Sequence, residues 1–432
     1  MNTATNYHNN QITTPNNKMT AYRDIYEQYV DEASFLWVLR SIAIEQPHYT
    51  KTDIYELEQR IEAQLDGLMT SVDVAWEICL DALELEEAGE VFTATVIAFK
   101  SHDTVKIQKA IEVGLNSDET IKGLISALGW LPEKFVHPWI KKFLSSKDLN
   151  HKYLALASCS VRRENPGEHL NRMLARDDCK QHSKLYSRAL RLIGEIRRQD
   201  LMSALQEAML SDDEDIKFWS NWSAILLGNI KCVENLEPYV FKTGTHQKNA
   251  IKIAFRVLPI EQARVWISKL SSDKEQIRAI IMATGILGDP HAVNWLILKM
   301  RESAVSRLAG ESFNMITGFD LEKNQLLGEV PAHLYMQPNN DSIDDDVSID
   351  EDENLLWPDY EKVSSFWMNN GSNFISGHRY YMGQSINSDM LNEKINSENQ
   401  RLRHAAAMEL ALTNSATPLI NTRARSLRIN ND

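Results

Sequence analysis

Apolar side chains recur at helical spacing along most of the chain, and the clearest example lies between residues 275 and 300. Ile277, Ile280 and Ile281 share one face of a predicted helix. The sequence Gly-Asp-Pro at 288–290 interrupts the pattern, and a glycine near a helix end with a proline close behind it is a stop signal. Apolar spacing resumes over 292–300. The stretch therefore predicts two amphipathic helices joined by a tight turn.

The same pattern occurs repeatedly before residue 275. Glycines that follow an apolar run and precede a second helical pattern stand at 129, 194, 228 and 288. Their gaps are one or two multiples of roughly 30–34 residues, within the range of helical repeats. Near Val161 and Leu258 the apolar register continues without a glycine. A single helix pair cannot bury its apolar faces alone, whereas a stack of pairs can. The sequence therefore predicts an all-α fold, an α-solenoid of about six stacked helix pairs close to the HEAT type.

Short polar links separate several of the predicted pairs. They end in Ser or Asp, which are good N-caps because their side-chain oxygens accept from the first free backbone N–H groups of a helix. These links lie at 145–148, 176–178, 211–213 and 271–273.

The composition along the chain predicts five segments. We expect a disordered polar tail, an N-terminal helical region, the repeat array, an acidic loop or linker, and a C-terminal helical module that caps the stack. These segments span 1–20, 21–117, 118–322, 323–354 and 355–432. Within the last, 378–386 is predicted as a short extended or turn segment, and 399–412 as a helix.

Charge is concentrated in the acidic linker. The net charge is −14, and eight of the thirteen residues at 341–353 are acidic. The loop lacks the turn glycine of an EF-hand, so we interpret it as a mobile acidic linker. A second acidic group, between Asp81 and Glu90, has no histidine near it and is interpreted as a solvated helix end. The acidic balance disfavours non-specific nucleic-acid binding. We expect no metal site, no cofactor and no catalytic residues.

The cysteines and the N-terminus indicate a cytoplasmic protein. The four cysteines form no CxxC motif, and Cys79 and Cys159 lie on apolar helical faces, so they are predicted to be buried free thiols. The Asn-rich N-terminus has no apolar core of a signal peptide, and no apolar run approaches the ~20 residues of a membrane span.

Aromatic and arginine clusters are the candidate binding groups of the array. Trp219, Trp222 and Leu226 follow the i, i+3, i+7 spacing of a core-facing stripe, although such a cluster can also hold a peptide or a base. Six arginines form either a modest basic strip or ion pairs with nearby carboxylates, and we favour pairing. They are Arg162, Arg163, Arg188, Arg191, Arg197 and Arg198, and the carboxylates are Glu164, Glu168, Glu195 and Asp200.

The repeat type suggests which helices face a partner. Second helices usually line the concave face of a HEAT-type stack, and the candidates span 134–144, 168–175, 199–210, 233–241, 261–270 and 291–300. Aromatic residues dominate protein-binding hot spots. The predicted partner-binding residues, each with a competing role in the core, are Trp139, Tyr239, Trp266, Trp295, Trp219 and Trp222.

Several segments together resemble one uncharacterised bacterial family of HEAT-like proteins that are often encoded among type VI secretion genes, near spike and effector genes. The resemblance spans most of 22–425. It is carried by HYT at 48–50, QLDGL at 64–68, GEVFTA at 89–94, SALGWLP at 126–132, FWSNWSAILLGN at 218–229, GDPHAVNWLI at 288–297, RLAGESFNMITGFDL at 307–321, WPDYEKV at 357–363 and QRLRHAAAMELAL at 400–412. It implies a secretion context and supplies no catalytic motif.

Two function hypotheses follow. The first is a non-enzymatic protein-binding solenoid associated with type VI secretion, which binds an effector or toxin as an immunity protein, or delivers an effector to the spike as an adaptor. The alternative is a HEAT-like enzyme or nucleic-acid-binding module, for which Asp66, Glu195 and Glu311 are the available carboxylates. The expected partner is a protein, with no nucleic acid and no membrane.

Overall fold

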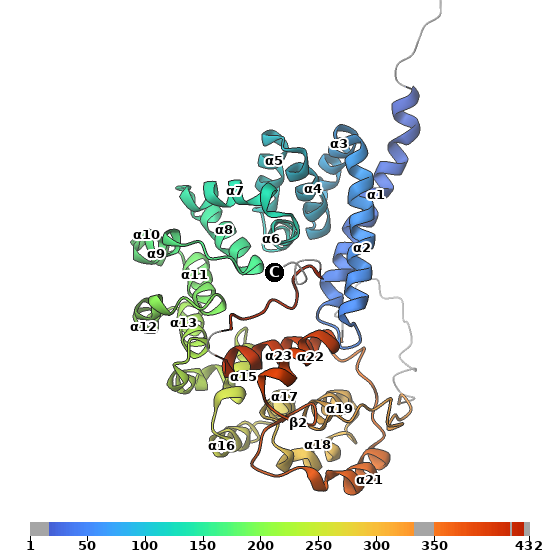
Figure 1. The fold of residues 1–432 in the computed structure, drawn as a ribbon, viewed down its shortest axis with the longest axis vertical. Coiled ribbons are helices and arrows are strands. Elements are labelled where there is room, and N and C mark those ends of the chain that lie inside the picture. Colours follow the sequence, from blue (N-terminus) through green and yellow to red (C-terminus); the bar gives the residue numbers. More distant parts are fainter. Residues whose placement is uncertain (1–16, 332–349, 415–416, 427–432) are drawn as a thin grey trace, which may run out of the picture. The chain divides into compact units, whose positions relative to one another are not determined.

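The computed structural model describes residues 17–331, 350–414 and 417–426, and it is mostly helical, which confirms the all-α prediction (Figure 1). The chain forms two compact units. The first comprises Met1–Ser41 with Glu56–Pro138, and the second Ile42–Tyr55 with Trp139–Asp432. The predicted boundary at 117/118 is thus not where the units divide. Within the described ranges, no helix has the length and apolarity that a membrane crossing needs.

The first unit is helical, and a glycine allows the close contact between two of its helices. Its helices are α1 (Asn17–Ala43), α2 (Lys51–Leu68), η1 (Met69–Ser71), α3 (Val72–Ala82), η2 (Leu83–Leu85), α4 (Ala88–Ser101), α5 (Thr104–Gly114), α6 (Thr120–Trp130) and α7 (Glu133–Ser145). Part of α1, α2 and α7 belongs to the second unit. A Cβ on Gly123 would lie 2.0 Å from the Ala88 carbonyl oxygen, so only glycine lets α6 pack this closely on α4. Most of the predicted N-terminal tail lies outside the described residues, but 17–20 begin α1 and are helical, contrary to the prediction.

The second unit contains successive helix pairs followed by a C-terminal module. The first helices of the pairs are α8 (Leu149–Arg162), α11 (Ser183–Glu195), α13 (Glu214–Leu226), α15 (Gln247–Val257), α17 (Ile277–Leu287) and α19 (Ser303–Thr317). Between them lie α9 (Glu168–Ala175), α10 (Asp177–Lys180), η3 (Gln199–Leu201), α12 (Met202–Ala208), η4 (Ile230–Leu236), α14 (Glu237–Phe241), α16 (Ile260–Leu270), η5 (Lys274–Gln276), η6 (Pro290–Ala292) and α18 (Val293–Lys299). The first helices pack on one another in sequence order, α8 on α11, α11 on α13, α15 on α17 and α17 on α19.

A glycine and a serine repeat at two of these contacts. A Cβ on Gly194 of α11 would lie 2.7 Å from Ser223 Oγ of α13, and one on Gly285 of α17 would lie 2.8 Å from Ser312 Oγ of α19. Each serine donates to the carbonyl four residues before the glycine, at 2.7 Å for Ser223 to Leu190 and 3.2 Å for Ser312 to Ile281. The two helix contacts therefore use the same close approach.

All of the first helices except α15, whose C-cap Leu258 is extended, are followed closely by a left-handed residue. Gly288 and Gly318 have φ of 74° and 70° at the C-caps of α17 and α19, and Gly228 has φ of 97° just after α13. After α8 and α11 the corresponding residues are Arg163 and Arg197, with φ of 56° and 61°. Gly288 and Gly228 thus act as predicted.

Two of the predicted stop glycines have another role. Gly129 and Gly194 are the penultimate residues of α6 and α11, so each lies in the last turn of its helix but does not take the left-handed conformation that ends it. Gly194 has no side chain where α11 packs closely on α13. The repeated glycines in the sequence therefore meet two different requirements, a left-handed helix end and a close contact between helices.

The polar links cap helices as predicted at three of the four places. Asp148, Asp213 and Asp273 precede α8, α13 and η5, and their side chains accept from Asn150, Ile216 and Glu275 backbone N–H groups. At 176–178 the N-cap of α10 is Arg176, whose side chain caps no backbone N–H group. Asp177 and Asp178 are already the first two residues of this short helix, so neither is its N-cap.

The C-terminal module packs on both first and second helices of the second unit. It contains α21 (Tyr360–Asn370), η7 (Gly371–Asn373), α22 (Ser388–Ser397), α23 (Gln400–Thr413) and an antiparallel pair of strands, β1 (Tyr380–Tyr381) and β2 (Gln384–Ser385), in the segment predicted to be extended. α23 contacts α13 and α15, whereas α16 and α18 lie on the other side of α15, α17 and α19 (Figure 1). The module therefore contacts first helices through α23 and β1, and the second helix α18 through α21, while the use of second helices as a partner-binding face stays a prediction.

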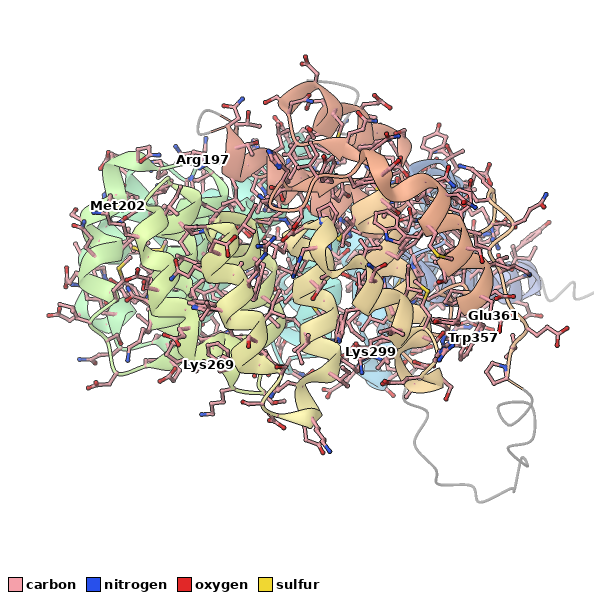
Figure 2. All side chains as sticks on the ribbon, turned by 90° about the horizontal axis from the view of Figure 1, so that it is seen from below. Arg197, Met202, Lys269, Lys299, Trp357 and Glu361 are labelled. Atoms are coloured by element: carbon pink, nitrogen blue, oxygen red, sulfur yellow. The ribbon has the colours of Figure 1, made fainter. Side chains whose placement is uncertain are left out.

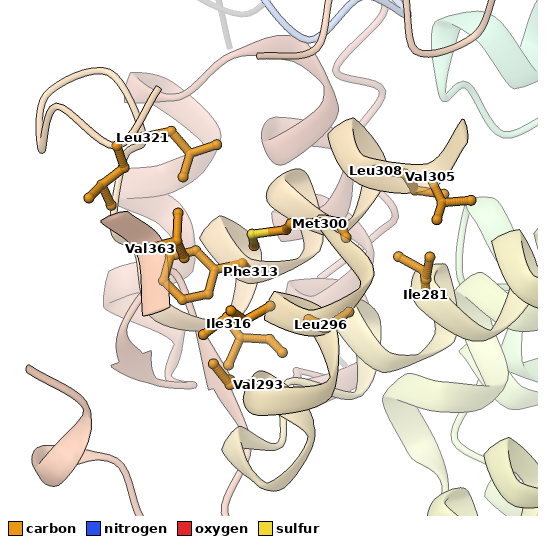
Figure 3. Packing of buried hydrophobic residues seen from close by; sticks show 13 residues of the cluster. Ile281, Val293, Leu296, Met300, Val305, Leu308, Phe313, Ile316, Leu321 and Val363 are labelled. Carbon is orange, nitrogen blue, oxygen red and sulfur yellow. The ribbon is translucent and has the colours of Figure 1, made fainter. Parts of the chain in front are cut away.

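The apolar core continues from the array into the module. Ile281, Leu296 and Phe313, from α17, α18 and α19, surround a buried cluster that Val363 of α21 completes (Figure 3). Burial of these side chains supplies the main favourable free energy for docking α21 on the last helix pair. All four cysteines are free and buried, as predicted for Cys79 and Cys159.

The described end of the acidic linker is held by ion pairs. Arg278 of α17 contacts both carboxylate oxygens of Asp352, at 2.7 and 2.8 Å, and Asp352 is buried. Lys248 of α15 pairs with Glu351, and Arg307 of α19 with Asp350. The predicted mobile linker is therefore anchored at 350–352, while 332–349 lie outside the described residues.

Candidate interaction surface

A line of basic residues follows one face of α11. Lys184, Arg188 and Arg191 are spaced i, i+4 and i+7, which places them on the same side of a helix, and Glu195 follows one turn later. Lys184 is exposed and its Nζ lies 5.0 Å from the centre of the Tyr153 ring on α8. Arg188 and Arg191 keep 15% and 37% of their side-chain surface accessible. This face of α11 is thus cationic and reachable by solvent.

Glu195 is the buried carboxylate that organises these arginines. Its oxygens lie 2.8 Å from Arg188 Nη2, 2.9 Å from Arg191 Nε and 3.5 Å from Arg163 Nη1, and Ser160 Oγ donates to it at 2.5 Å. Burial alone would raise its pKa, but the three guanidinium groups outweigh burial and hold the pKa at about 2. Three positive groups around one carboxylate leave two positive charges in excess at neutral pH.

Arg191 also lies on an aromatic platform. Its guanidinium carbon is 4.4 Å from the centre of the Trp219 ring and 5.9 Å from that of Trp222, and the two indoles meet edge-on with centroids 5.4 Å apart. Trp219 is half-buried and Trp222 is buried. The close α11–α13 approach at Gly194 and Ser223 brings this arginine and the indoles together. A guanidinium stacked on an indole presents a flat cation with fixed orientation.

The aromatic cluster continues below this platform. Phe218 stacks on His246 with ring centroids 4.2 Å apart and meets Tyr239 edge-on at 5.2 Å. His246 Nε2 lies 2.6 Å from Asp215 Oδ1, and the Tyr239 hydroxyl donates to the Glu214 carbonyl at 3.3 Å. These contacts fix α13 against the following pair and support Trp219 from beneath.

The structure brings together three of the six predicted partner-binding residues, Trp219, Trp222 and Tyr239, and separates the others. Trp266 retains 5% exposure and packs on Phe241 and Phe255, which favours its core role. Trp139 and Trp295 are half-buried and lie beneath Lys142 and Lys299, at 4.2 and 5.6 Å. Trp219 is therefore the predicted residue with the most developed surroundings for binding.

Most of the arginines are paired, as the sequence indicates. Arg162 pairs with Glu164 at 2.7 Å and Arg198 with Asp200 at 2.6 Å. Of the three candidate carboxylates, Glu311 pairs with Arg401 at 3.0 Å and Asp66 with Lys100 at 3.3 Å. Burial raises the pKa of Glu311, although Arg401 opposes that shift. With Glu195 paired as well, each of the three carboxylates has a cationic partner.

Arg163 and Arg197 have a second function that the sequence did not indicate. Arg163 Nε donates to the Leu419 carbonyl at 2.6 Å, and Arg197 Nε donates to the Thr417 carbonyl at 3.0 Å. Arg197 also donates to the carbonyls of Ala411 and Asn414. Both arginines occupy the left-handed helix-end position, so the chain uses this row of helix ends to hold its own C-terminal segment.

The sequence did not predict the Arg191–Trp219 contact, although the spacing of the two residues is consistent with it. The two residues are separated by about one repeat, and residues one repeat apart lie side by side on stacked helices. Comparison of the chain with protein-family models, with curated proteins and with solved structures gives no match, so the geometry itself carries the functional argument.

Proposed function

We propose that this chain is a non-enzymatic protein-binding protein with a HEAT-like α-solenoid architecture in its second unit. The left-handed helix ends at 163, 197, 228, 288 and 318, with intervals of about one or two repeats, support the repeat architecture. So do the matching Gly194–Ser223 and Gly285–Ser312 contacts. Stacked helix pairs of this kind offer an extended surface for a folded partner.

The resemblance to HEAT-like proteins encoded among type VI secretion genes supports the cellular context of this proposal. The partner is then an effector or toxin of that system. The chain acts either as an immunity protein that grips the toxin, or as an adaptor that delivers an effector to the spike. Both roles require a stable protein–protein contact and no chemical step.

The observation that carries the proposal is the Arg191–Trp219 platform. Trp and Arg are enriched in binding hot spots, where a flat, desolvated contact contributes most of the affinity. Trp219 is half-buried, so its inner edge is fixed by packing while its remaining surface is accessible. A side chain fixed in this way loses little conformational entropy when a partner binds.

Binding of the purified effector encoded next to this protein tests the proposal. We expect the wild-type chain to bind it, and Trp219→Ala to weaken binding by about 2 kcal/mol or more. Trp295→Ala is the matched control, since it is also half-buried but lies on α18, away from the platform. Absence of binding by the wild-type chain at physiological salt would overturn the proposal, and equal losses for both variants would place the site elsewhere.

A phenotype separates the two roles. Cells that express the toxin survive with an immunity protein and die without it. Loss of an adaptor instead stops export of the effector and does not poison the cell. Wild-type and Trp219→Ala chains compared in both assays would assign the role.

A further inference from the structure

Two extended segments of the chain lie on the C-terminal ends of first helices. A helix leaves the carbonyls at its C-terminal end without partners inside the helix, so these carbonyls can accept from another part of the chain. In the second unit, residues 380–383, which include β1, donate N–H groups to such carbonyls, and so does the C-terminal segment, residues 417–426. The same feature of the repeats thus holds an extended chain at two places.

Residues 380–383 bind through main-chain atoms. Tyr380 N–H donates to the Gly288 carbonyl at the end of α17, at 2.8 Å, and Met382 N–H donates to the Met315 carbonyl in the last turn of α19, at 2.7 Å. The donors are backbone groups, and the acceptors are helix-end carbonyls.

The C-terminal segment makes the same kind of contact on α8 and α11. Leu419 N–H donates to the carbonyl of Glu195, the last residue of α11, at 3.2 Å, and the Leu419 carbonyl accepts from Arg163 Nε at 2.6 Å. The Thr417 carbonyl accepts from Arg197 Nε at 3.0 Å. Every residue type has these backbone groups, so the bonds select an extended chain, and side-chain contacts must supply the selectivity for sequence.

Two side chains of the segment supply such contacts. Leu419 is buried, with 8% exposure. Asn421, two residues later, donates from Nδ2 to the Val161 carbonyl in the last turn of α8, at 2.8 Å. An apolar residue followed two positions later by an amide is therefore the pattern that the ends of α8 and α11 accept.

The two arginines that hold the segment adopt a strained backbone conformation. Arg163 and Arg197 have φ of 56° and 61°, at helix ends where other repeats have Gly228, Gly288 and Gly318. Glycine takes this conformation without a steric cost. Strained residues of this kind cluster at ligand clamps and binding sites. The arginines therefore indicate that these two helix ends serve to hold a chain.

The C-terminal segment is the more readily released of the two. Within 417–426, Leu419 is the one buried apolar side chain, Ile420 is half-buried, and the remaining contacts are polar. By contrast, 380–383 lies between α21 and α22 in the chain, and its Tyr381 belongs to the buried cluster of α22 and α23. A segment with little buried apolar surface opens locally at low free energy.

Resting on the proposed function, we propose that the ends of α8 and α11 form a peptide-binding surface, covered in the free chain by residues 417–426, and that an extended segment of the protein partner displaces this cover. The main chain of the partner segment contacts Glu195, Arg163 and Arg197, and an apolar side chain takes the position of Leu419. The free chain therefore carries its own competitor for the partner.

A release variant of the full chain tests the surface. Leu419→Asn places a polar amide in a buried position and should free the segment. Faster amide exchange at 417–422, with unchanged exchange in α17, verifies the release. Asn421→Ala, which removes the contact with Val161, is a second release variant for the case that Leu419→Asn does not fold.

Fluorescence anisotropy then measures binding in trans. The probe is a labelled peptide with the sequence of 417–426, and the control peptide has Asn in place of its leucine. We expect the probe to bind the release variant at least about tenfold more tightly than the wild-type chain, and at least about tenfold more tightly than the control peptide binds the release variant. Equal binding of the probe to both chains, or of both peptides to the release variant, would overturn the proposal.

A charge-removing substitution locates the binding. In the release variant, Arg163→Gln should weaken the probe about fivefold or more, because it removes a charged donor to the peptide carbonyl. The matched control is Lys269→Gln on α16, which also removes one cation and lies with Lys299 at the edge of the second unit opposite Arg197 (Figure 2). Equal effects of the two substitutions would refute the assigned position.

Effector binding keeps this inference separate from the proposed function. We expect the effector to bind the release variant about fivefold or more tightly than the wild type, because it no longer has to displace a competitor. If the effector binds both chains equally, the displacement is wrong and the protein-binding function stands. If the probe binds the release variant in an Arg163-dependent way and the effector binds neither chain, the peptide-binding surface stands and the proposed partner is wrong.

Discussion

Arg197 offers a direct test of why two first helices are followed by a left-handed arginine, whereas α13, α17 and α19 are followed by a left-handed glycine. Its φ of 61° is left-handed, a conformation that costs a non-glycine residue about 1–2 kcal/mol. Replacing it by glycine removes this cost. The same change deletes donors to the carbonyls of Ala411, Asn414 and Thr417. The outcome depends on which of these two effects is larger.

The hydrogen bonds should dominate. Bonds from a charged donor contribute about 1.5–3 kcal/mol each, and Arg197 is partly exposed, so we take the lower values and assign about 3–5 kcal/mol to the set. Subtracting the relieved backbone strain leaves a net loss of about 1–4 kcal/mol in the docking of the C-terminal segment. Burial lowers the pKa of Arg197, and the carbonyl oxygens compensate for part of the lost hydration.

Hydrogen exchange at the backbone amides of 411–421 measures this loss where it occurs. For Arg197→Gly, a loss of about 1–4 kcal/mol predicts exchange there that is about fivefold to several hundredfold faster, because each 1.4 kcal/mol is a factor of ten. Exchange in α17 should not change. Arg197→Lys, which keeps one charged donor, should fall between wild type and glycine.

Glu86→Gly is the matched control for backbone strain. Glu86 has φ of 51°, and its side chain accepts one exposed hydrogen bond, from Asn116. Glycine there relieves the same strain and removes little, so the melting temperature should stay constant or rise. If Arg197→Gly behaves like this control and the protection of 411–421 is unchanged, the guanidinium contacts are weaker than the backbone strain and our reasoning is refuted.

Three further outcomes follow from packing and charge. Gly194→Ala forces a methyl group against Ser223 and should destabilise the second unit by about 1–3 kcal/mol in urea unfolding. Gly244→Ala is the control and should not destabilise it, because nothing lies within 4 Å of the added carbon. Equal effects of the two substitutions would contradict the close approach of α11 and α13. Trp266→Ala removes a buried indole and should cost about 3–5 kcal/mol in the same assay, and a loss below about 1 kcal/mol would return Trp266 to the surface candidates. The pKa of Glu195 is depressed from 4.5 to about 2 in the folded state, so its contribution is complete above the unfolded pKa and is lost as pH falls from about 4.5 towards 2. The urea concentration at the unfolding midpoint should decrease for the wild type as the pH is lowered across that range, and it should decrease less for Glu195→Gln. If the midpoints of both proteins decrease equally with pH, Glu195 is not the cause of the lost stability.

The sequence by itself determined the helices and many of their ends, because these depend on neighbouring residues. Apolar spacing placed the helix pairs, and Asp148, Asp213 and Asp273 were recognisable as caps from their position before each apolar run. Gly288 followed by Pro290 marked a real helix end. Each of these signals acts within about one helical turn of the residue that carries it.

The roles of the charged residues were decided by the tertiary structure. Arg163 and Arg197 contact carbonyls more than two hundred residues away in the chain, and no local pattern distinguishes them from the ion-paired Arg162 and Arg198. The place where α23 docks, on α13 and α15, was likewise decided by the packed fold, because amphipathic spacing shows that a helix has an apolar side but not which neighbour covers the rest. The stacking of Arg191 on Trp219 likewise needs the close approach of α11 and α13, which only the packed fold provides.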